Sequence, residues 1–206
     1  MYIAIAGNIG SGKSTLTSML ARHYRWEPCY ESVEQNPYLE DYYRDIERWS
    51  FNLEIYFLKE RFRDLIAIQQ SEKTVVQDRT IFEGVHVFMR NNYDMGHLSA
   101  RDYQTCLELF DEMLQMVRLP DLLIYIRASV STLVAQIQKR GREYEQTMRL
   151  DYLQGLERRY EEWISAYQGP LIIIDGDHCK FGDDPSAFKQ VTDKIDAKLF
   201  GLFPME

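Results

Sequence analysis

The sequence contains Gly7-Asn8-Ile9-Gly10-Ser11-Gly12-Lys13-Ser14, a stretch with the spacing G-x-x-x-x-G-K-[ST]. An apolar, strand-like run at residues 2–6 precedes it, and a helix-compatible run begins at Thr15. In such a context glycines let backbone N–H groups close around phosphate oxygens, and the N-terminus of the following helix adds a favourable dipole. We therefore expect a phosphate-binding loop after a first strand. The alternative is a glycine turn that binds nothing.

This loop predicts a nucleoside triphosphate ligand. The residues expected to bind it are Gly7, Asn8, Ile9, Gly10, Ser11, Gly12, Lys13, Ser14 and Thr15. Lys13 is expected to bridge the β- and γ-phosphates, and Ser14 to present its hydroxyl to Mg²⁺, which neutralises charge on a transferred phosphoryl group. ATP and Mg²⁺ are thus the expected donor and cofactor. The motif leaves the acceptor open, because water, a nucleotide, a shikimate-like alcohol or a nucleoside could each take the phosphate.

The rest of the chain alternates between two kinds of pattern. Apolar runs rich in Ile, Val and Leu lie at residues 2–6, 73–77, 122–126 and 171–174, with a weaker strand candidate at 28–30. Helix-compatible stretches lie at 38–70, which fits one or two helices, and at 98–117 and 152–167. The alternation predicts an α/β fold with a five-stranded parallel sheet flanked by helices, and continuous apolar runs indicate strands covered on both faces. With the loop, this is a P-loop NTPase fold, and the length suits one domain, 1–206.

Composition excludes several classes of protein. The 206 residues include 24 Lys and Arg against 32 Asp and Glu, a net charge of −8, which is the wrong sign for binding polymeric nucleic acid. Cys29, Cys106 and Cys179 are odd in number and lack a C-x-x-C pair, so neither a zinc site nor a disulfide framework is expected. No apolar run approaches 18 residues and no basic leader precedes the first strand, which predicts a cytoplasmic protein without a membrane span.

Four further motifs carry a resemblance to a known family. They are Tyr30-Glu31-Ser32-Val33, Arg48-Trp49-Ser50-Phe51, Asp78-Arg79-Thr80, and Arg140-Gly141-Arg142 ahead of Glu145. In their order and spacing the sequence resembles the deoxynucleoside kinases over nearly its whole length, and Asn36-Pro37-Tyr38-Leu39 is more similar to the small bacterial deoxyadenosine kinases than to the animal members. The resemblance implies ATP-dependent 5′-phosphorylation of a deoxyribonucleoside in nucleotide salvage, with deoxyadenosine preferred. It also implies a homodimer through helices near Leu53 and Leu107.

The same resemblance assigns the catalytic groups. Glu31 is implied as the general base that accepts the proton of the 5′-hydroxyl, an assistance worth roughly 10²–10⁴ in rate, with Glu34 as a rival. Asp78 is implied to support Mg²⁺ through water, and Arg79 to hold the base carboxylate and the 5′ oxygen. A surface salt bridge is the alternative for these two residues. Arg140 and Arg142 are implied to form an arginine lid over the phosphates, although Gln136 stands where the family often has another arginine.

The acceptor residues are also implied by the family pattern. Tyr43 and Glu145 are expected at the sugar 3′-hydroxyl, with aromatic core as the alternative for Tyr43. Glu54 and Arg61 lie seven residues apart, so on one helix they face the same side and can both reach a base plane. A carboxylate at 54 accepts hydrogen bonds from adenine N6 or guanine N1 and N2, while Arg61 donates. Gly84 stands where many relatives carry an acid that contacts this arginine.

Other functions are weighed against this one. A deoxyguanosine or deoxycytidine kinase has the same machinery. A nucleoside monophosphate kinase of the thymidylate type would need extra basic residues for the acceptor phosphate, whereas the region 27–60 is acidic and aromatic. A non-catalytic assembly subunit has no physical reason to retain the reactive side chains Lys13, Ser14, Glu31, Asp78 and Arg79 together.

Overall fold

A computed structural model describes residues 1–31, 36–142, 145 and 148–201. The strands are β1 (Tyr2–Gly7), β2 (Glu27–Cys29), β3 (Val75–Asp78), β4 (Leu122–Arg127) and β5 (Leu171–Asp175). The helices are α1 (Lys13–Tyr24), α2 (Leu39–Arg44), α3 (Ile46–Gln70), α4 (Ile81–Glu83), the π-helical segment η1 (Gly84–Met89), α5 (Arg90–Asp94), α6 (Ala100–Leu114), α7 (Val130–Arg140), α8 (Leu150–Ala166) and α9 (Pro185–Phe200).

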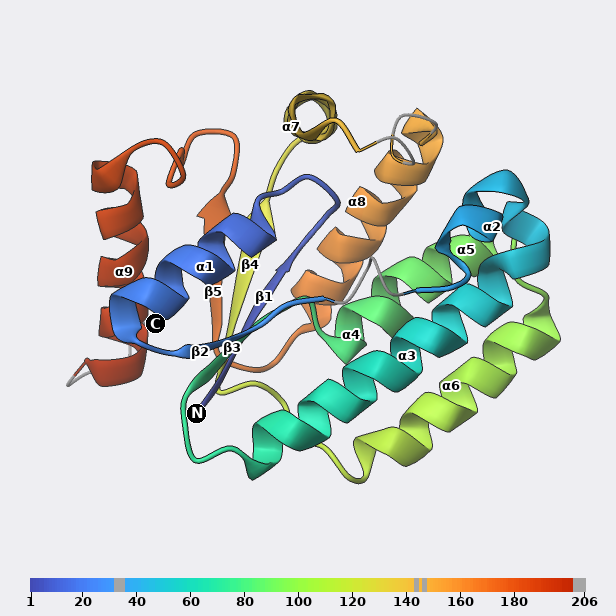
Figure 1. Cartoon of the computed structure of the whole chain (residues 1–206), viewed down its shortest axis with the longest axis horizontal. Coiled ribbons are helices and arrows are strands. Elements are labelled where there is room, and N and C mark those ends of the chain that lie inside the picture. Colours follow the sequence, from blue (N-terminus) through green and yellow to red (C-terminus); the bar gives the residue numbers. More distant parts are fainter. Residues whose placement is uncertain (32–35, 143–144, 146–147, 202–206) are drawn as a thin grey trace.

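The five strands form one parallel sheet in the order β2-β3-β1-β4-β5, which confirms the predicted architecture. Central β1 pairs with β3 on one side, where Ile5 lies opposite Asp78, and with β4 on the other, where Gly7 lies opposite Ile126. Because all strands point the same way, their carboxyl ends share one edge of the sheet (Figure 1). The phosphate loop after β1 and the Asp78-Arg79-Thr80 turn after β3 are therefore neighbours.

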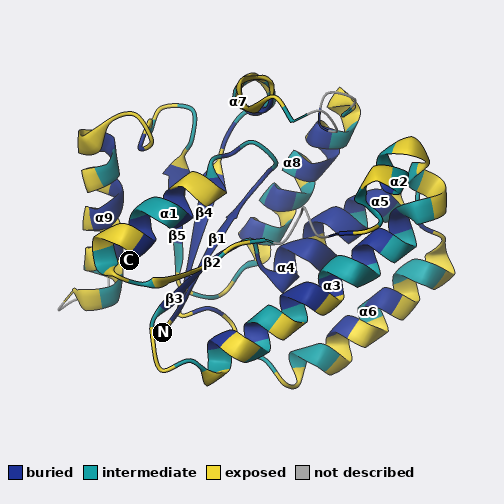
Figure 2. Ribbon diagram, in the orientation of Figure 1, coloured by how far each residue is buried: buried dark blue, intermediate teal, exposed yellow. Residues whose placement is uncertain are grey.

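Helices cover both faces of the sheet (Figure 1). Ile3 and Ile5 of β1 pack with residues of α1 and α9, whereas Tyr2, Ala4 and Ala6 pack with residues of α3, η1, α6 and α8. The inner strands are buried on both faces, as predicted, but the edge strands differ (Figure 2). Ile173 of β5 is 36% exposed and β2 is largely exposed, because an edge strand has a neighbour on one side alone.

Helix-capping hydrogen bonds set the helix boundaries that the sequence pattern did not define. The region 38–70 forms two helices because Asp45 ends α2, its backbone N–H donating to Asp41 O, while its side chain caps α3 by accepting from the Arg48 N–H. The predicted helices at 98–117 and 152–167 correspond to α6 and α8. Short α4, η1 and α5 and the terminal α9 were not predicted.

Candidate active site

Most of the predicted site residues line one cavity of about 390 Å³ at the carboxyl edge of the sheet. Those that line it are Ile9, Gly10, Lys13, Ser14, Glu31, Tyr43, Glu54, Arg61, Asp78, Arg79, Arg140, Arg142 and Glu145. The other predicted loop residues, Gly7, Asn8, Ser11, Gly12 and Thr15, belong to the same loop but are not among the lining residues. Residues 32–35, including the rival base Glu34, lie outside the described residues.

The phosphate loop holds the side chain of Lys13 through its own backbone carbonyl groups. Gly10 and Gly12 have φ angles of 84° and 94°, in the left-handed region that a glycine adopts without strain. Lys13 is buried, and its Nζ donates to Gly7 O at 2.7 Å and to Asn8 O at 3.0 Å. Burial, helped by the nearby Arg79 cation, lowers the pKa of Lys13 to about 8. A bound polyphosphate would reverse this by supplying negative charge at the ammonium group.

Ser14, at the start of α1, points its hydroxyl across the edge of the sheet to β3. Its Oγ donates to Asp78 Oδ2 at 2.5 Å. A hydroxyl and a carboxylate this close offer two oxygen ligands of the kind that Mg²⁺ uses beside substrate phosphates and water. Among the described residues no group of three or more His, Cys, Asp or Glu is placed to hold a metal ion.

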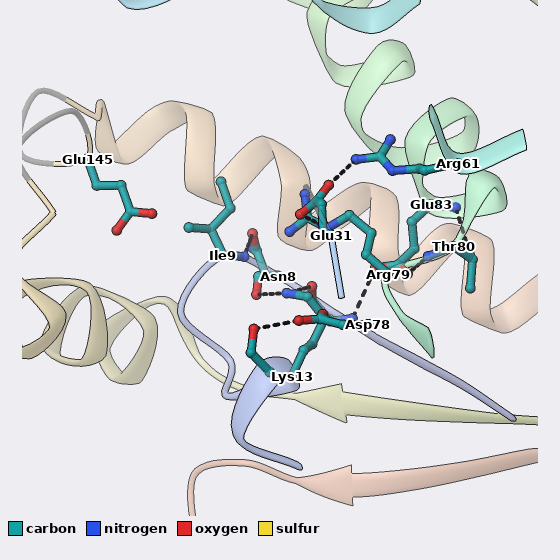
Figure 3. Close-up of polar contacts among 12 residues, drawn as sticks. Asn8, Ile9, Lys13, Glu31, Arg61, Asp78, Arg79, Thr80, Glu83 and Glu145 are labelled. Atoms are coloured by element: carbon teal, nitrogen blue, oxygen red, sulfur yellow. Dashed lines mark hydrogen bonds and ion pairs between the residues drawn. The ribbon is translucent and has the colours of Figure 1, made fainter. Parts of the chain in front are cut away.

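Glu31 lies between two arginines (Figure 3). Its Oε1 pairs with Arg61 Nη2, and its Oε2 lies 3.4 Å from Arg79 Nε. Burial favours the protonated form of Glu31, but Arg79 and Arg61 outweigh that effect and hold its pKa at about 2. Glu31 is therefore ionised at neutral pH and can accept a hydrogen bond from an alcohol. The pairing also means that Arg61, predicted to donate to a base, contacts this carboxylate directly.

The turn after β3 is strained and is held by a residue that the sequence analysis missed. Arg79 has a φ of 68°, uncommon for a residue with a side chain. Beside it the fully buried Glu83 accepts from Thr80 N at 2.9 Å, from Gly7 N at 3.2 Å and from the hydroxyl of Tyr160 at 2.7 Å. Glu83 thus ties the turn to the phosphate loop (Figure 3). The capping-box spacing Thr80-x-x-Glu83 was the signal that could have found it.

At the other end of the cavity, Glu54 and Arg61 do project from one side of α3, as predicted, and both are buried. Glu54 Oε1 accepts from Asn92 Nδ2 at 2.8 Å. Burial raises the pKa of Glu54 to about 7, against the opposing effects of Arg61 and Asn92. A Cβ added to Gly84 would lie 2.5 Å from Arg61 Nη1, so η1 packs directly on the arginine where relatives are expected to carry an acid.

The segment after α7 brings the remaining predicted residues to the cavity. Gly141 ends α7 with a φ of 69°. Arg140 Nε donates to Glu145 Oε2 at 3.0 Å, and Arg142 Nη1 lies 3.7 Å from Glu145 Oε1. Glu145 is buried although both arginines are partly exposed.

Tyr43 lines the cavity with its ring against that of Tyr42. Sequence reasoning missed five other aromatic lining residues: Tyr30, which precedes Glu31 in its motif, and Tyr42, Phe57, Phe88 and Tyr152, which no motif distinguishes from core.

Comparison with known proteins agrees with this geometry. A model of the deoxynucleoside kinase family matches residues 3–200. A deoxyadenosine/deoxycytidine kinase of Bacillus subtilis is 37% identical over 196 residues, 94% of this chain and 90% of the relative. A deoxyguanosine kinase of Lactobacillus acidophilus is 36% identical over 218 residues, 99% of this chain and 94% of the relative. A solved structure of deoxyadenosine kinase from M. mycoides, with the products dCMP and a flexible dCDP bound, has a TM-score of 0.85 and 32% identity, covering 96% of this chain and 100% of that one. The same enzyme with bound dATP gives a TM-score of 0.84, covering 95% of this chain and 100% of that one.

Proposed function

The chain belongs to the deoxynucleoside kinase family, and we propose that it transfers the γ-phosphate of ATP to the 5′-hydroxyl of deoxyadenosine in preference to other deoxynucleosides. The observation that carries this proposal is the placement of Glu31, ionised between Arg61 and Arg79, in one cavity with Lys13 and Glu54. The proposed phosphate loop, the proposed proton acceptor and the proposed base-recognition pair thus line one cavity.

On the acceptor side, Glu31 accepts the hydrogen bond of the 5′-hydroxyl and then its proton, as the 5′ oxygen bonds to the γ-phosphorus and the bond from that phosphorus to the bridging oxygen of the leaving ADP breaks. Its low pKa keeps it in the accepting form at any physiological pH. Arg79 contacts the same carboxylate and lies in the turn that Glu83 holds, so it can position both Glu31 and the attacking 5′ oxygen. Catalysis by such a site depends mainly on positioning and electrostatics.

On the donor side, the loop N–H groups and Lys13 would bind the β- and γ-phosphates. Ser14 and Asp78 are the residues that would hold Mg²⁺, and the bound ion would supply neutralisation of phosphate charge. Arg140 and Arg142, at the glycine-ended terminus of α7, are proposed as a lid that adds positive charge to the transferred group. Tyr43 and Glu145 are proposed at the sugar 3′-hydroxyl.

The base preference rests on Glu54. As a carboxylate it accepts from an exocyclic amino group, and Arg61, which lines the same cavity, is the proposed donor to the same base. Deoxycytidine is the second candidate acceptor, because cytosine also carries an exocyclic amino group beside a ring nitrogen. The relative from Bacillus subtilis is named for both substrates, and the M. mycoides structure holds dCMP.

The decisive experiment is initial-rate phosphorylation, with ATP and Mg²⁺, of the four deoxynucleosides, their ribose counterparts and dTMP. A highest kcat/KM on deoxyadenosine supports the proposal. A highest value on deoxyguanosine or deoxycytidine leaves the kinase but overturns the base preference. Turnover of dTMP alone overturns nucleoside phosphorylation in favour of a monophosphate kinase.

We also propose that the enzyme is a cytoplasmic homodimer of one-domain chains, associated through α3 and α6. Leu107 packs partly buried on the helical core, whereas Leu53 is buried against the cavity, so neighbouring side chains of α3 would form the interface. Among the described helices none is both long and apolar enough to cross a membrane. Sedimentation velocity tests the dimer, because a mass near 24.4 kDa would contradict it.

A further inference from the structure

Next to Glu54 lies a buried asparagine, Asn92, whose side-chain hydrogen bonds are not those expected of a residue that only fills the core. Asn92, in α5, is fully buried, with 0% exposure. A buried amide needs partners, and most side-chain hydrogen bonds of this kind go to the backbone or to water. Both amide atoms of Asn92 instead contact side chains that line the cavity: Nδ2 donates to Glu54 at 2.8 Å, and Oδ1 accepts from the Tyr42 hydroxyl at 3.2 Å.

Its neighbour provides an internal contrast. Asn91 is equally buried, at 1% exposure, yet its Nδ2 contacts Met95 Sδ within the same short segment, and its Oδ1 has no partner among the described residues. Neither Asn91 nor Asn92 lines the cavity itself. Only Asn92 is connected to the residues that do.

The hydrogen bonds fix which group faces Glu54. The Asn92 amide nitrogen faces Glu54 and can only donate, while Oδ1 lies 3.2 Å from the Tyr42 hydroxyl and 3.5 Å from His97 Nδ1, two groups that are able to donate to it. Glu54 Oε1 must then be an acceptor, and the carboxyl plane is held on α3. Glu54 Oε2 has no hydrogen-bond partner among the described residues, which leaves it for the base.

We propose that Asn92 is a positioning residue for base selection: by holding Glu54 as a hydrogen-bond acceptor, it makes the enzyme select bases that carry an exocyclic amino group. The inference rests on the proposed function and adds a residue that does not touch the substrate. It predicts that Asn92 acts on discrimination between bases rather than on phosphoryl transfer.

The test compares deoxyadenosine with purine 2′-deoxyriboside, which lacks only the 6-amino group. In Asn92→Leu, which keeps the branched shape and the number of heavy atoms but removes both hydrogen-bonding groups, the ratio of kcat/KM between the two substrates should fall at least about tenfold, as expected when a hydrogen-bonded group loses its partner. The loss should come from KM for deoxyadenosine, with kcat and the values for the deamino substrate within about threefold. Asn92→Ala is the second variant should Asn92→Leu not fold. Asn91→Ala is the matched control and should keep the wild-type ratio.

An unchanged ratio in the Asn92 variants overturns the proposal, and so does an equal loss on both substrates or the same loss in Asn91→Ala, since each indicates a structural role alone. Failure of the proposed function is seen separately, in the wild type. If that enzyme prefers deoxycytidine or deoxyguanosine, the same variants are compared on that nucleoside with and without its exocyclic amino group, and the prediction for Asn92 is unchanged.

Discussion

At the scale of single residues, Glu31 is the proposed general base. Replacing it by Gln keeps its size but removes the proton acceptor and unpairs Arg61 and Arg79. We expect kcat to fall at least about 10²-fold, with KM for the nucleoside changed by only a few-fold. Steady-state kinetics on Glu31→Gln measure this. Glu60→Gln, a buried carboxylate of α3 that pairs with Lys59 and Arg63 and does not line the 390 Å³ cavity, is the control. A mild effect at Glu31 would move the base to another residue, such as Glu34.

Glu54 carries a stability cost that depends on pH. Its pKa rises from 4.5 to about 7 on folding, because burial outweighs the attraction of Arg61 and Arg79. The folded state therefore binds the proton more tightly than the unfolded state, and stability falls as pH rises from about 4.5 to 7. Glu54→Gln removes this ionisation. It should leave stability nearly unchanged at pH 4.5 and raise it by about 1–3 kcal/mol at pH 8. Thermal unfolding at the two pH values tests the difference, and equal shifts at both would refute the assignment.

At the scale of elements, η1 sets the position of Arg61. Gly84 lets the π-helical segment lie against the guanidinium, where an added Cβ would approach Nη1 to 2.5 Å. Gly84→Ala should push Arg61 away from Glu31 and weaken that ion pair. We expect a fall in kcat of about 3- to 30-fold, since the loss is part of one charge contact. Gly155→Ala, which would meet Asn91 instead, controls for crowding in a helix. Wild-type kcat in Gly84→Ala would show that Arg61 has room to adapt.

The elements also show what the sequence could predict and why the rest escaped. The strands and long helices follow from apolar periodicity, and the meeting of the phosphate loop with Asp78 and Arg79 follows from parallel strands that end at one edge. Short η1 and α5 have no periodicity to detect over five or six residues. Asn92 is 38 positions from Glu54, and nothing in its neighbourhood distinguishes it from Asn91. The placement of the proposed catalytic residues at one edge of the sheet was therefore predictable, and the residues packed behind them were not.

At the scale of the whole molecule, the cavity joins two halves of the chain. Lys13 and Ser14 line it from the start of α1, whereas Glu54, Tyr43 and Tyr152 line it from α3, α2 and α8. Figure 1 shows where these helices lie. We therefore expect each substrate to bind mainly to one of these two sets of residues and to stabilise the fold through its own contacts. Measuring the increase in Tm with ATP alone and with deoxyadenosine alone therefore tests how the cavity is divided between the two substrates.

With ATP or deoxyadenosine at about 100 times its Kd, stability should rise by about 2.7 kcal/mol, a Tm increase of about 5–10 °C for a chain of this size. Lys13→Ala should lose most of the ATP increase and keep that of deoxyadenosine, because its Nζ lies at the phosphate loop. Glu54→Gln should show the opposite pattern, because its carboxylate lies at the far end with Asn92. Crossed losses would establish a donor half and an acceptor half. If both variants lost both increases, the two ligands would share contacts, and the division of the cavity proposed for the transfer reaction would be wrong.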